Sequence, residues 1–332
     1  MAEKFQALRI VFMGTPEFAV ASLDALVQSG CNIVGVITAP DKQGGRGMQL
    51  QQSAVKKYAA EKNLHILQPE KLKNPAFLAA LKILNADLQI VVAFRMLPEL
   101  VWNMPPMGTV NLHGSLLPQY RGAAPINWAV INGEKQTGVT TFKLKHEIDT
   151  GDILLQEGFF IGENDTAGEV HDQMKEIGAN LLVKTVKELA DASLLEQPQL
   201  MSSNEQAAEL HHAPKLFTET CKIDFSKTVN VVHNLIRGLS PFPGAFTELG
   251  GKVLKIYRSK KEVLTEEILN KKDVTNVIVQ AASSVSIGSY KTDSKTFLKF
   301  ACSNGYVHVL ELQLEGKKKM SVEEFLRGYR FG

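Results

Sequence analysis

Short apolar runs alternate with amphipathic helical patterns along the first half of the chain. The run Leu8–Met13 stops at Gly14-Thr15-Pro16, and apolar positions then recur at helical spacing as far as Gly30. The alternation continues with further strand-like and helical runs, which lie at residues 32–38, 53–62, 75–84, 87–93 and 108–113. Strands separated by helices of this length predict an α/β fold with a mostly parallel, doubly wound sheet.

The character of the chain changes near residue 191. Before that point come two more strand-like runs and a long helical pattern, at residues 138–144, 153–161 and 166–190. Residues 191–214 are rich in Ser, Gln, Pro and Glu, which is typical of a linker that runs over the surface. We therefore expect one domain over residues 1–190 and a second over residues 215–332.

The second domain is expected to be small and mainly β. An amphipathic helix over Ser226–Leu239 precedes several short strand candidates, which lie at residues 245–249, 252–258, 275–279, 296–302 and 306–312. Short strands with turn signals between them predict a small β-barrel, and a five-stranded barrel would be OB-like.

The composition is that of a globular protein. The 332 residues are 44% hydrophobic and 22% charged, which excludes the disordered, collagen-like and coiled-coil classes. No apolar stretch approaches the roughly 18 residues of a membrane span, and no apolar signal core precedes the first strand. Cys31, Cys221 and Cys302 are too few and too far apart for a disulfide framework or a zinc cluster. We therefore expect a cytoplasmic protein that does not bind a membrane.

Charge is distributed unevenly, although the formal net charge is only +2. Residues 1–210 carry 18 Lys and Arg against 23 Asp and Glu, whereas residues 211–332 carry 19 against 12. A basic C-terminal third favours a domain that meets a polyanion, and it fits a solvated basic surface equally well.

The turn after the first strand lacks the fingerprint of a dinucleotide site. Residues 14–19 read Gly-Thr-Pro-Glu-Phe-Ala, without Gly-x-Gly-x-x-Gly spacing, and no acidic residue ends the second strand. This disfavours a nicotinamide dehydrogenase and indicates a plain strand–helix turn, although the helix N-terminus could hold another group.

Asn111 and His113 are the strongest candidates for chemistry. They stand two residues apart at the end of a predicted strand, so their side chains point to the same face, at the edge where open α/β sheets bind ligands. An amide and an imidazole side by side can stabilise a developing oxyanion, and the imidazole can also carry a proton. The residue types alone fit a structural histidine equally well.

Asp149 lies between two strand candidates and could orient His113, which would complete an Asn/His/Asp group. Taken alone, an Asp before Thr-Gly is most often a turn residue. No His-x-x-x-His pair or carboxylate cluster indicates a metal, and no Gly-x-Ser-x-Gly elbow indicates a serine hydrolase.

Two basic segments could contact a polyanion. Residues 39–50 hold three glycines with Lys42 and Arg46, so a mobile and weakly basic loop is expected there, and residues 317–319 are three consecutive lysines. A solvated surface explains either segment separately.

The string NLHGSLLPQYRGAAPINWA, which begins at Asn111, closely resembles the signature of the 10-formyltetrahydrofolate-dependent formyltransferases. Asp149-Thr150-Gly151-Asp152 resembles the second block of that signature. The similarity extends in order over nearly the whole chain, through residues 13–19, 40–47, 223–225 and 236–245. These four segments are similar to the branch of the family that acts on methionyl-tRNA, whereas the glycinamide ribonucleotide branch usually lacks the C-terminal domain.

The resemblance implies a Rossmann-like formyltransferase domain followed by an OB-like domain that binds tRNA. It implies transfer of the formyl group of 10-formyltetrahydrofolate to the α-amine of methionine on initiator tRNA, without a metal, and we expect a monomer. The catalytic group implied is Asn111, His113 and Asp149. The residues implied to contact folate are Ser115, Leu116, Leu117 and Pro118, and those implied to contact the tRNA are Lys42 and Arg46.

The chain departs from the family pattern in two places. A Tyr-Gly pair and an extra residue are expected within Ala93–Pro98, which the resemblance places near the pterin, and Gln43 stands where a Pro is usual. Two alternatives stay open. A formyltransferase acting on a sugar-nucleotide amine would share the Asn/His/Asp group, and a folate-binding or RNA-binding protein without turnover is excluded only by kinetics.

Overall fold

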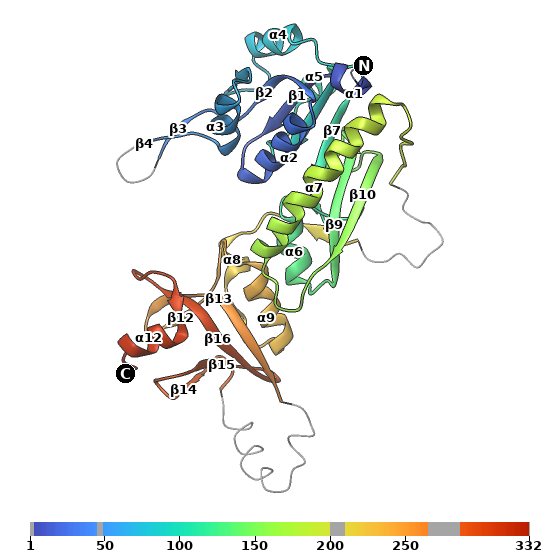
Figure 1. Ribbon diagram of the computed structural model, residues 1–332. Coiled ribbons are helices and arrows are strands. Elements are labelled where there is room, and N and C mark those ends of the chain that lie inside the picture. Colours follow the sequence, from blue (N-terminus) through green and yellow to red (C-terminus); the bar gives the residue numbers. More distant parts are fainter. Residues whose placement is uncertain (1–2, 45–48, 200–209, 265–285, 332) are drawn as a thin grey trace. The chain divides into compact units, whose positions relative to one another are not determined.

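The protein is described here by a computed structural model, which covers residues 3–44, 49–199, 210–264 and 286–331 (Figure 1). By internal contacts the chain divides into two compact units. The N-terminal unit comprises Met1–Pro125, Gln136–Phe160 and His171–Ala213, and the C-terminal unit comprises Ile126–Lys135, Ile161–Val170 and Pro214–Gly332. Two segments that precede residue 190 therefore belong to the C-terminal unit. The domain boundaries at residues 190 and 215 stay a prediction.

The N-terminal unit is built on a mixed sheet whose strand order is β10-β9-β7-β6-β1-β2-β5. The strands are β1 (Arg9–Gly14), β2 (Asn32–Ile37), β5 (Ile66–Leu67), β6 (Leu88–Val92), β7 (Thr109–His113), β9 (Gln136–Lys143) and β10 (Ile153–Phe160). The five strands from β7 to β5 are parallel. At the other edge β9 is antiparallel to β7, and β10 is antiparallel to β9. The predicted doubly wound α/β fold is therefore confirmed.

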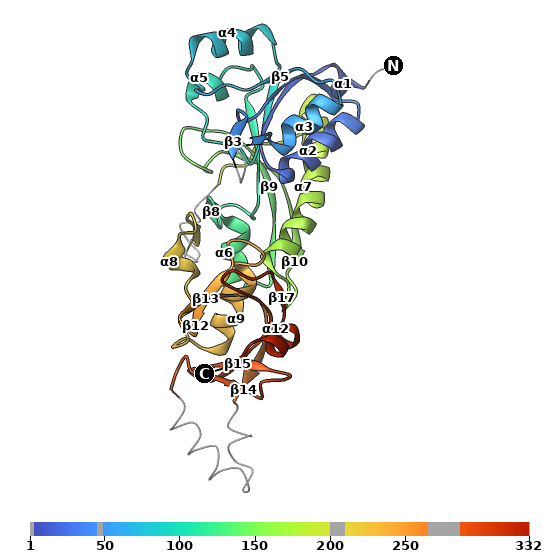
Figure 2. The same ribbon diagram turned by 90° about the vertical axis from the view of Figure 1, so that its left-hand side faces the viewer.

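Helices cover both faces of this sheet. The helices are α1 (Lys4–Ala7), α2 (Glu17–Gln28), α3 (Ala54–Glu61), α4 (Pro75–Ile83), α5 (Glu99–Trp102) and α7 (Ala167–Ala190). Figure 2 shows α4 and α5 on one side of the sheet, with α2, α3 and α7 on the other. Val11 and Met13 of β1 pack with Phe77 and Leu81 of α4 in one buried cluster. Because both faces are covered, β6 is buried at every position, as expected of a central parallel strand.

Within the segment expected to be a loop, residues 42–44 and 49–51 pair as two short strands, and residues 45–48 lie outside the described part of the chain. β3 (Lys42–Gly44) and β4 (Gln49–Gln51) pair antiparallel, with Lys42 opposite Gln51. A second short pair joins distant parts of the chain, because β8 (Arg121–Gly122) runs parallel to β11 (His212–Ala213). Neither pair has an apolar alternation long enough to be recognised in the sequence.

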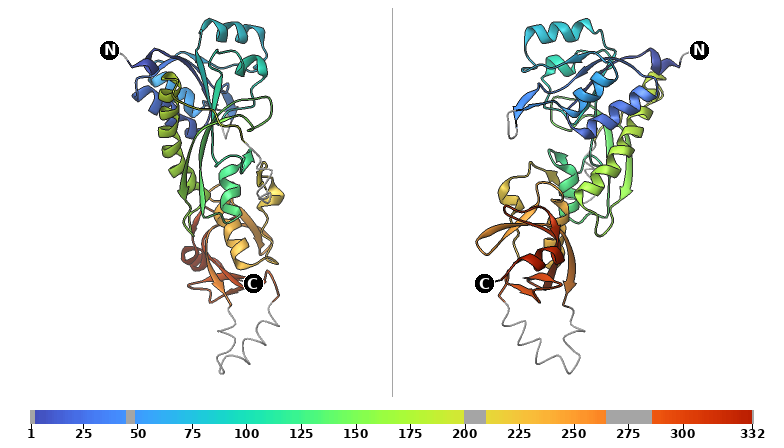
Figure 3. Two further views of the ribbon diagram at one scale, coloured as in Figure 1. Left: turned by 90° about the vertical axis from the view of Figure 1, so that its right-hand side faces the viewer. Right: turned by 60° about the vertical axis from the view of Figure 1, so that its left-hand side comes forward.

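The C-terminal unit contains a curled antiparallel sheet, which confirms the OB-like class. Its described strands are β12 (Ala245–Leu249), β13 (Lys252–Val263), β14 (Tyr290–Thr292), β15 (Leu298–Cys302), β16 (Gly305–Leu314) and β17 (Met320–Ser321). They lie in the order β12-β13-β16-β15-β14, with β17 also on β16. The expected strand at residues 275–279 lies outside the described residues. Figure 3 shows the orange and red strands curling around the red helix α12 (Val322–Gly328).

The core of this unit lies between the sheet and its helices. The helices α6 (Pro125–Ile131), α8 (Thr218–Cys221) and α9 (Val229–Gly238) complete it. Val232 and Ile236 of α9 are buried together with Ile256 and Val309 of the sheet. The segment 161–166 is tied to α9, because the buried Arg237 guanidinium donates to the carbonyls of Gly162 and Asp165.

Candidate active site

The C-terminal end of β7 places Asn111 and His113 on one face of the sheet. β7 lies between β6 and β9, and Asn111 pairs with Val91 on one side and Phe142 on the other. His113 is only 6% exposed, whereas Asn111 is half-buried. Among the described residues the carboxamide of Asn111 has no hydrogen-bond partner, so it is available to a ligand.

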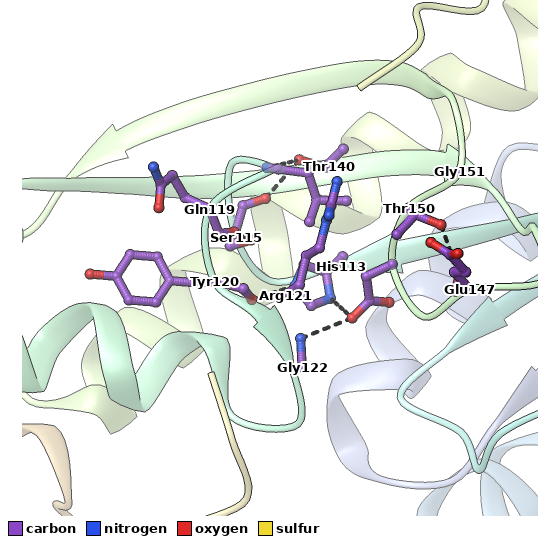
Figure 4. A network of polar contacts seen from close by, with 12 residues as sticks. His113, Ser115, Gln119, Tyr120, Arg121, Gly122, Thr140, Glu147, Thr150 and Gly151 are labelled. Atoms are coloured by element: carbon purple, nitrogen blue, oxygen red, sulfur yellow. Dashed lines mark hydrogen bonds and ion pairs between the residues drawn. The ribbon is translucent and has the colours of Figure 1, made fainter. Parts of the chain in front are cut away.

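The imidazole of His113 lies between two protein groups (Figure 4). Its Nε2 donates to the backbone carbonyl of Tyr120 at 2.9 Å, and its Nδ1 faces Oδ2 of Asp149 at 3.8 Å. The same Oδ2 accepts a hydrogen bond from the backbone N–H of Gly122 at 3.0 Å. Because a carbonyl only accepts, Nε2 keeps its hydrogen, and Nδ1 is the nitrogen at which a proton can be exchanged. The carboxylate of Asp149 faces Nδ1.

Two tight turns bring these partners to the ring. Tyr120 and Asp149 both adopt left-handed backbone conformations, with φ of 59° and 54°, which are uncommon for residues other than glycine. Gly151 allows the second turn to close, because a Cβ at that position would overlap the carbonyl of Lys143. Asp149 therefore faces His113 through a strained backbone conformation, and such a conformation persists only where the surrounding contacts stabilise it.

The turn expected to contact folate is held firmly by hydrogen bonds. Ser115 and Leu117 are buried, and the hydroxyl of Ser115 donates to the carbonyl of Gln119. The Thr140 hydroxyl donates to the carbonyl of Ser115 and accepts from the N–H of Leu117. Leu116 packs against the sheet, close to Gly138. Only Leu116 and Pro118 are partly exposed, and a contact of this turn with folate stays a prediction.

Sequence reasoning missed Thr140 and Gln156, which lie behind the turn. Thr140 is fully buried on β9, and the Gln156 side chain on β10 donates both to the carbonyl of Leu117 and to Thr140 Oγ1 at 2.9 Å. The only sign of Thr140 and Gln156 in the sequence is that each is a polar residue within an apolar strand. Their partners come from a turn more than 15 residues away.

Of the two residues expected to contact tRNA, the structure describes one. Lys42 is exposed on β3, and Arg46 lies outside the described residues. Lys42 lines a cavity of about 540 Å³ together with Thr15, Phe94 and Arg95. The cavity thus joins the first strand–helix turn to the segment where the chain departs from the family pattern.

The base of the β3–β4 hairpin is tied to the body of the unit through Asp41. Its carboxylate binds the ammonium of Lys56 and accepts from Gln68 Nε2 at 2.7 Å. Gln68 also donates to the carbonyl of Ala39 at 2.8 Å. The hydrogen bond from Lys56 is the main cause that lowers the pKa of Asp41, so the carboxylate stays ionised at neutral pH.

The described part of the chain holds no group of three His, Cys, Asp or Glu that could bind a metal ion. In the same residues, no helix combines the length and apolar character needed to cross a membrane.

Comparison of the chain with known proteins shows the family to which it belongs. Residues 8–186 match the family model "Formyl transferase", and residues 215–330 match "Formyl transferase, C-terminal domain". The chain belongs to the formyl transferase family.

The relatives narrow this class. A methionyl-tRNA formyltransferase of Bacteroides fragilis is 50% identical over 98% of this chain and 96% of its own, and that of Phocaeicola vulgatus is 54% identical over 97% and 96%. Among solved structures, an N-formyltransferase from Helicobacter canadensis, in complex with folinic acid and dTDP-3-aminofucose, shares 18% identity. It covers 94% of this chain and 100% of its own at a TM-score of 0.62, which shows a common fold.

Proposed function

We propose that this protein transfers the formyl group of 10-formyltetrahydrofolate to the α-amine of methionine carried by initiator tRNA. The observation that carries the proposal is the identity of about one half with methionyl-tRNA formyltransferases, which extends over 98% of the chain and so covers both units. The pairing of His113 with Asp149 at a strand end supports it, because acyl transfer needs a proton carrier beside the reacting carbon.

The neutral amine attacks the formyl carbon, and a tetrahedral intermediate with a negatively charged oxygen forms. The carboxamide of Asn111 and the protonated imidazole of His113 stabilise that oxygen. The amide of Asn111, which has no hydrogen-bond partner among the described residues, supports this role. Because Nε2 of His113 donates to the carbonyl of Tyr120, Nδ1 is the nitrogen that delivers its proton to the reaction.

Asp149 stabilises the charged form of His113 across 3.8 Å. Through a water molecule it also accepts the proton that the amine loses, while the bond between the formyl carbon and N10 of the folate breaks and N10 takes up the proton that Nδ1 of His113 releases. The hydrogen bond from Gly122 N–H holds the carboxylate in place. All three residues act without a metal ion.

The folate co-substrate lies along Ser115–Pro118 in this proposal. The turn is held at its backbone by Thr140 and Gln156, so it offers a rigid surface on which Leu116 and Pro118 are the partly exposed members. The Helicobacter canadensis relative bound folinic acid, which supports a formyl folate as the ligand.

The tRNA is bound by both parts of the chain. A C-terminal domain over residues 215–332, which carries most of the excess positive charge, contacts phosphates, and the linker 191–214 joins it to a catalytic domain over residues 1–190. Lys42 and Arg46 contact the acceptor end, and we expect the protein to act as a cytoplasmic monomer.

A formyl-transfer assay tests the proposal. The purified chain is supplied with 10-formyltetrahydrofolate and either initiator methionyl-tRNA or a dTDP-amino sugar, and formylated product is measured in each case. We expect rapid, folate-dependent formylation of the tRNA and none of the sugar nucleotide. Faster formylation of the sugar would establish the alternative, and binding of either substrate without product would show a protein without turnover.

A further inference from the structure

The described parts of the linker segment 191–214 lie directly on the turns that hold His113 and Asp149. The side chain of Gln199 makes the first connection. Its Nε2 donates to the backbone carbonyls of Asp149 at 3.0 Å and Gly151 at 2.7 Å, and its Oε1 accepts from the Arg121 guanidinium at 2.6 Å. One carboxamide therefore joins the Asp149 turn to the Tyr120–Gly122 turn.

The other described part of the linker contacts the Tyr120 side of the site. The carbonyl of His211 accepts from the N–H of Tyr120 at 2.7 Å, and the Tyr120 hydroxyl lies 3.1 Å from Nδ1 of His211. The pairing of β11 with β8 continues this contact, and the carbonyl of Ala213 accepts from the N–H of Ala123 at 2.7 Å.

The linker contacts coincide with the strained backbone of the site. Tyr120 and Asp149 are the two left-handed residues whose groups touch the imidazole of His113. A left-handed conformation at a non-glycine residue persists only where its surroundings determine it. At Asp149, the Gln199 carboxamide binds the residue's own carbonyl, and at Tyr120 the linker backbone binds the residue's own N–H.

We propose that Gln199 is a positioning residue of the active site, which holds the carboxylate of Asp149 opposite His113 through the two carbonyls that its Nε2 binds. The linker then completes the catalytic turns in addition to joining the two domains. This inference rests on the proposed function, because the work of Asp149 is to support His113 during formyl transfer.

Three variants of the full chain separate this role from general stability. Gln199→Ala removes both sets of bonds, whereas Gln199→Glu keeps an acceptor for Arg121 but loses the donor to the two carbonyls. Gln197→Ala is the matched control, since Gln197 lies two residues earlier in the same segment with an exposed side chain that has no hydrogen bond within the described residues. Melting temperature, kcat and the KM of both substrates are measured.

We expect kcat to fall about 10- to 100-fold in Gln199→Ala and Gln199→Glu, because small displacements of a catalytic group are costly. Both KM values should stay within about twofold of the wild type, and Gln197→Ala should behave as the wild type. Wild-type kcat in Gln199→Glu would mean that the donor to the Asp149 turn is unimportant and would overturn the proposal. The proposal would also be overturned if Gln197→Ala lost as much kcat and as much melting temperature as Gln199→Ala.

A double-mutant cycle with Asp149→Asn tests the route of the effect. If Gln199 acts through Asp149, adding Gln199→Ala to Asp149→Asn should lower the single-turnover rate by less than about twofold. Multiplicative losses would show that Gln199 acts elsewhere. A wild-type chain that fails to formylate methionyl-tRNA would refute the proposed function instead, whereas an active wild type with an unaffected Gln199→Ala refutes only the positioning role.

Discussion

The imidazole of His113 is hydrogen-bonded at Nε2 and faces Asp149 across 3.8 Å at Nδ1, while the carboxamide of Asn111 has no partner among the described residues. This difference fits the different tasks that we propose for the two side chains. In that proposal, His113 carries a proton while the Tyr120 carbonyl and Asp149 flank its ring, and Asn111 donates its N–H groups to the substrate. At the residue scale, the contacts of the ring are made by the protein itself, and electrostatic stabilisation of a transition state requires such fixed groups.

Truncating either donor should therefore reduce turnover more than binding. We expect His113→Ala and Asn111→Ala each to lower kcat by about 10²- to 10³-fold, as is typical for loss of one oxyanion donor. Steady-state formylation of methionyl-tRNA measures the effect, and His65→Ala, at an exposed histidine of the same unit, serves as the control. A folded variant with near-normal kcat would remove that residue from the catalytic group.

A second histidine affects stability rather than catalysis. His233 is 2% exposed, next to the hydroxyl of Ser259 and the carbonyl of Glu163, with Lys261 and Arg237 also nearby. Burial is the main cause that lowers its pKa from 6.5 to about 4. Between pH 6.5 and about pH 4, His233 is protonated in the unfolded chain but not in the folded chain. The stability of the C-terminal unit therefore falls as the pH falls through this range.

We expect the C-terminal unit to lose about 3 kcal/mol of stability between pH 7 and pH 4 from this residue alone, at 1.36 kcal/mol per pKa unit. His233→Gln should flatten that part of the pH dependence. Chemical unfolding followed by the fluorescence of Trp128, which lies in this unit, measures it in a Trp102→Phe background. An unchanged slope in His233→Gln would show that another group causes the loss.

At the scale of elements, the β3–β4 hairpin depends on a polar anchor at its base. The strands are only three residues long, too short to be stable alone, and the described positions of the hairpin are mainly polar. Asp41 binds Lys56 in the first turn of α3 and Gln68 directly after β5, which fixes the position at which β3 begins. The anchor therefore fixes where the hairpin leaves the body of the unit.

Neutralising the anchor should weaken tRNA binding and leave folate binding unchanged. We expect Asp41→Asn to raise the KM for methionyl-tRNA about fivefold, in keeping with the loss of one charged hydrogen bond. The KM for 10-formyltetrahydrofolate should stay within about twofold. Glu61→Gln, at an exposed carboxylate of α3, is the control. An equal rise in both KM values would indicate a general disturbance of the unit instead.

At the scale of the whole molecule, three lysines and a histidine of the basic C-terminal unit form a row across its sheet. Register places Lys260 of β13 beside His308 of β16, His308 beside Lys299 of β15, and Lys299 beside Lys291 of β14. Glu262 binds both Lys299 and His308. Lys260 and Lys291 form no ion pair within the described part of the chain, so they are free to meet phosphates.

Replacing these two lysines should reduce the salt dependence of tRNA binding. We expect Lys260→Gln/Lys291→Gln to make the slope of log Kd against log salt concentration shallower by about 2, since each phosphate contact contributes close to 1. The control pair is Lys73→Gln/Lys82→Gln, at two exposed lysines near and on α4 of the other unit. It should change the slope of log Kd against log salt concentration by less than about 0.5. Equal changes in both pairs would indicate a nonspecific effect of charge.

Most helices and strands were predictable because their residues repeat with the period of a buried face. The strands β1, β2, β6 and β12 and the helix α4 begin and end within about two residues of the expected positions. The helix α12 was missed although Ser321 and Glu324 form a capping box, because only two turns follow it. The β8–β11 pair could not be predicted, since two-residue strands carry no periodicity.

The sequence by itself determined the two-part α/β and antiparallel architecture, the family, and the placement of Asn111 and His113 on one face at a strand end. These follow from local periodicity and from a contiguous signature, which need no knowledge of distant contacts. Only the tertiary structure decided which ring nitrogen of His113 faces Asp149, that segments 126–135 and 161–170 belong to the C-terminal unit, and that Gln199 of the linker binds the Asp149 turn. Each of these is a contact between residues far apart in the chain, and side-chain hydrogen bonds of that kind leave no periodic trace in a sequence.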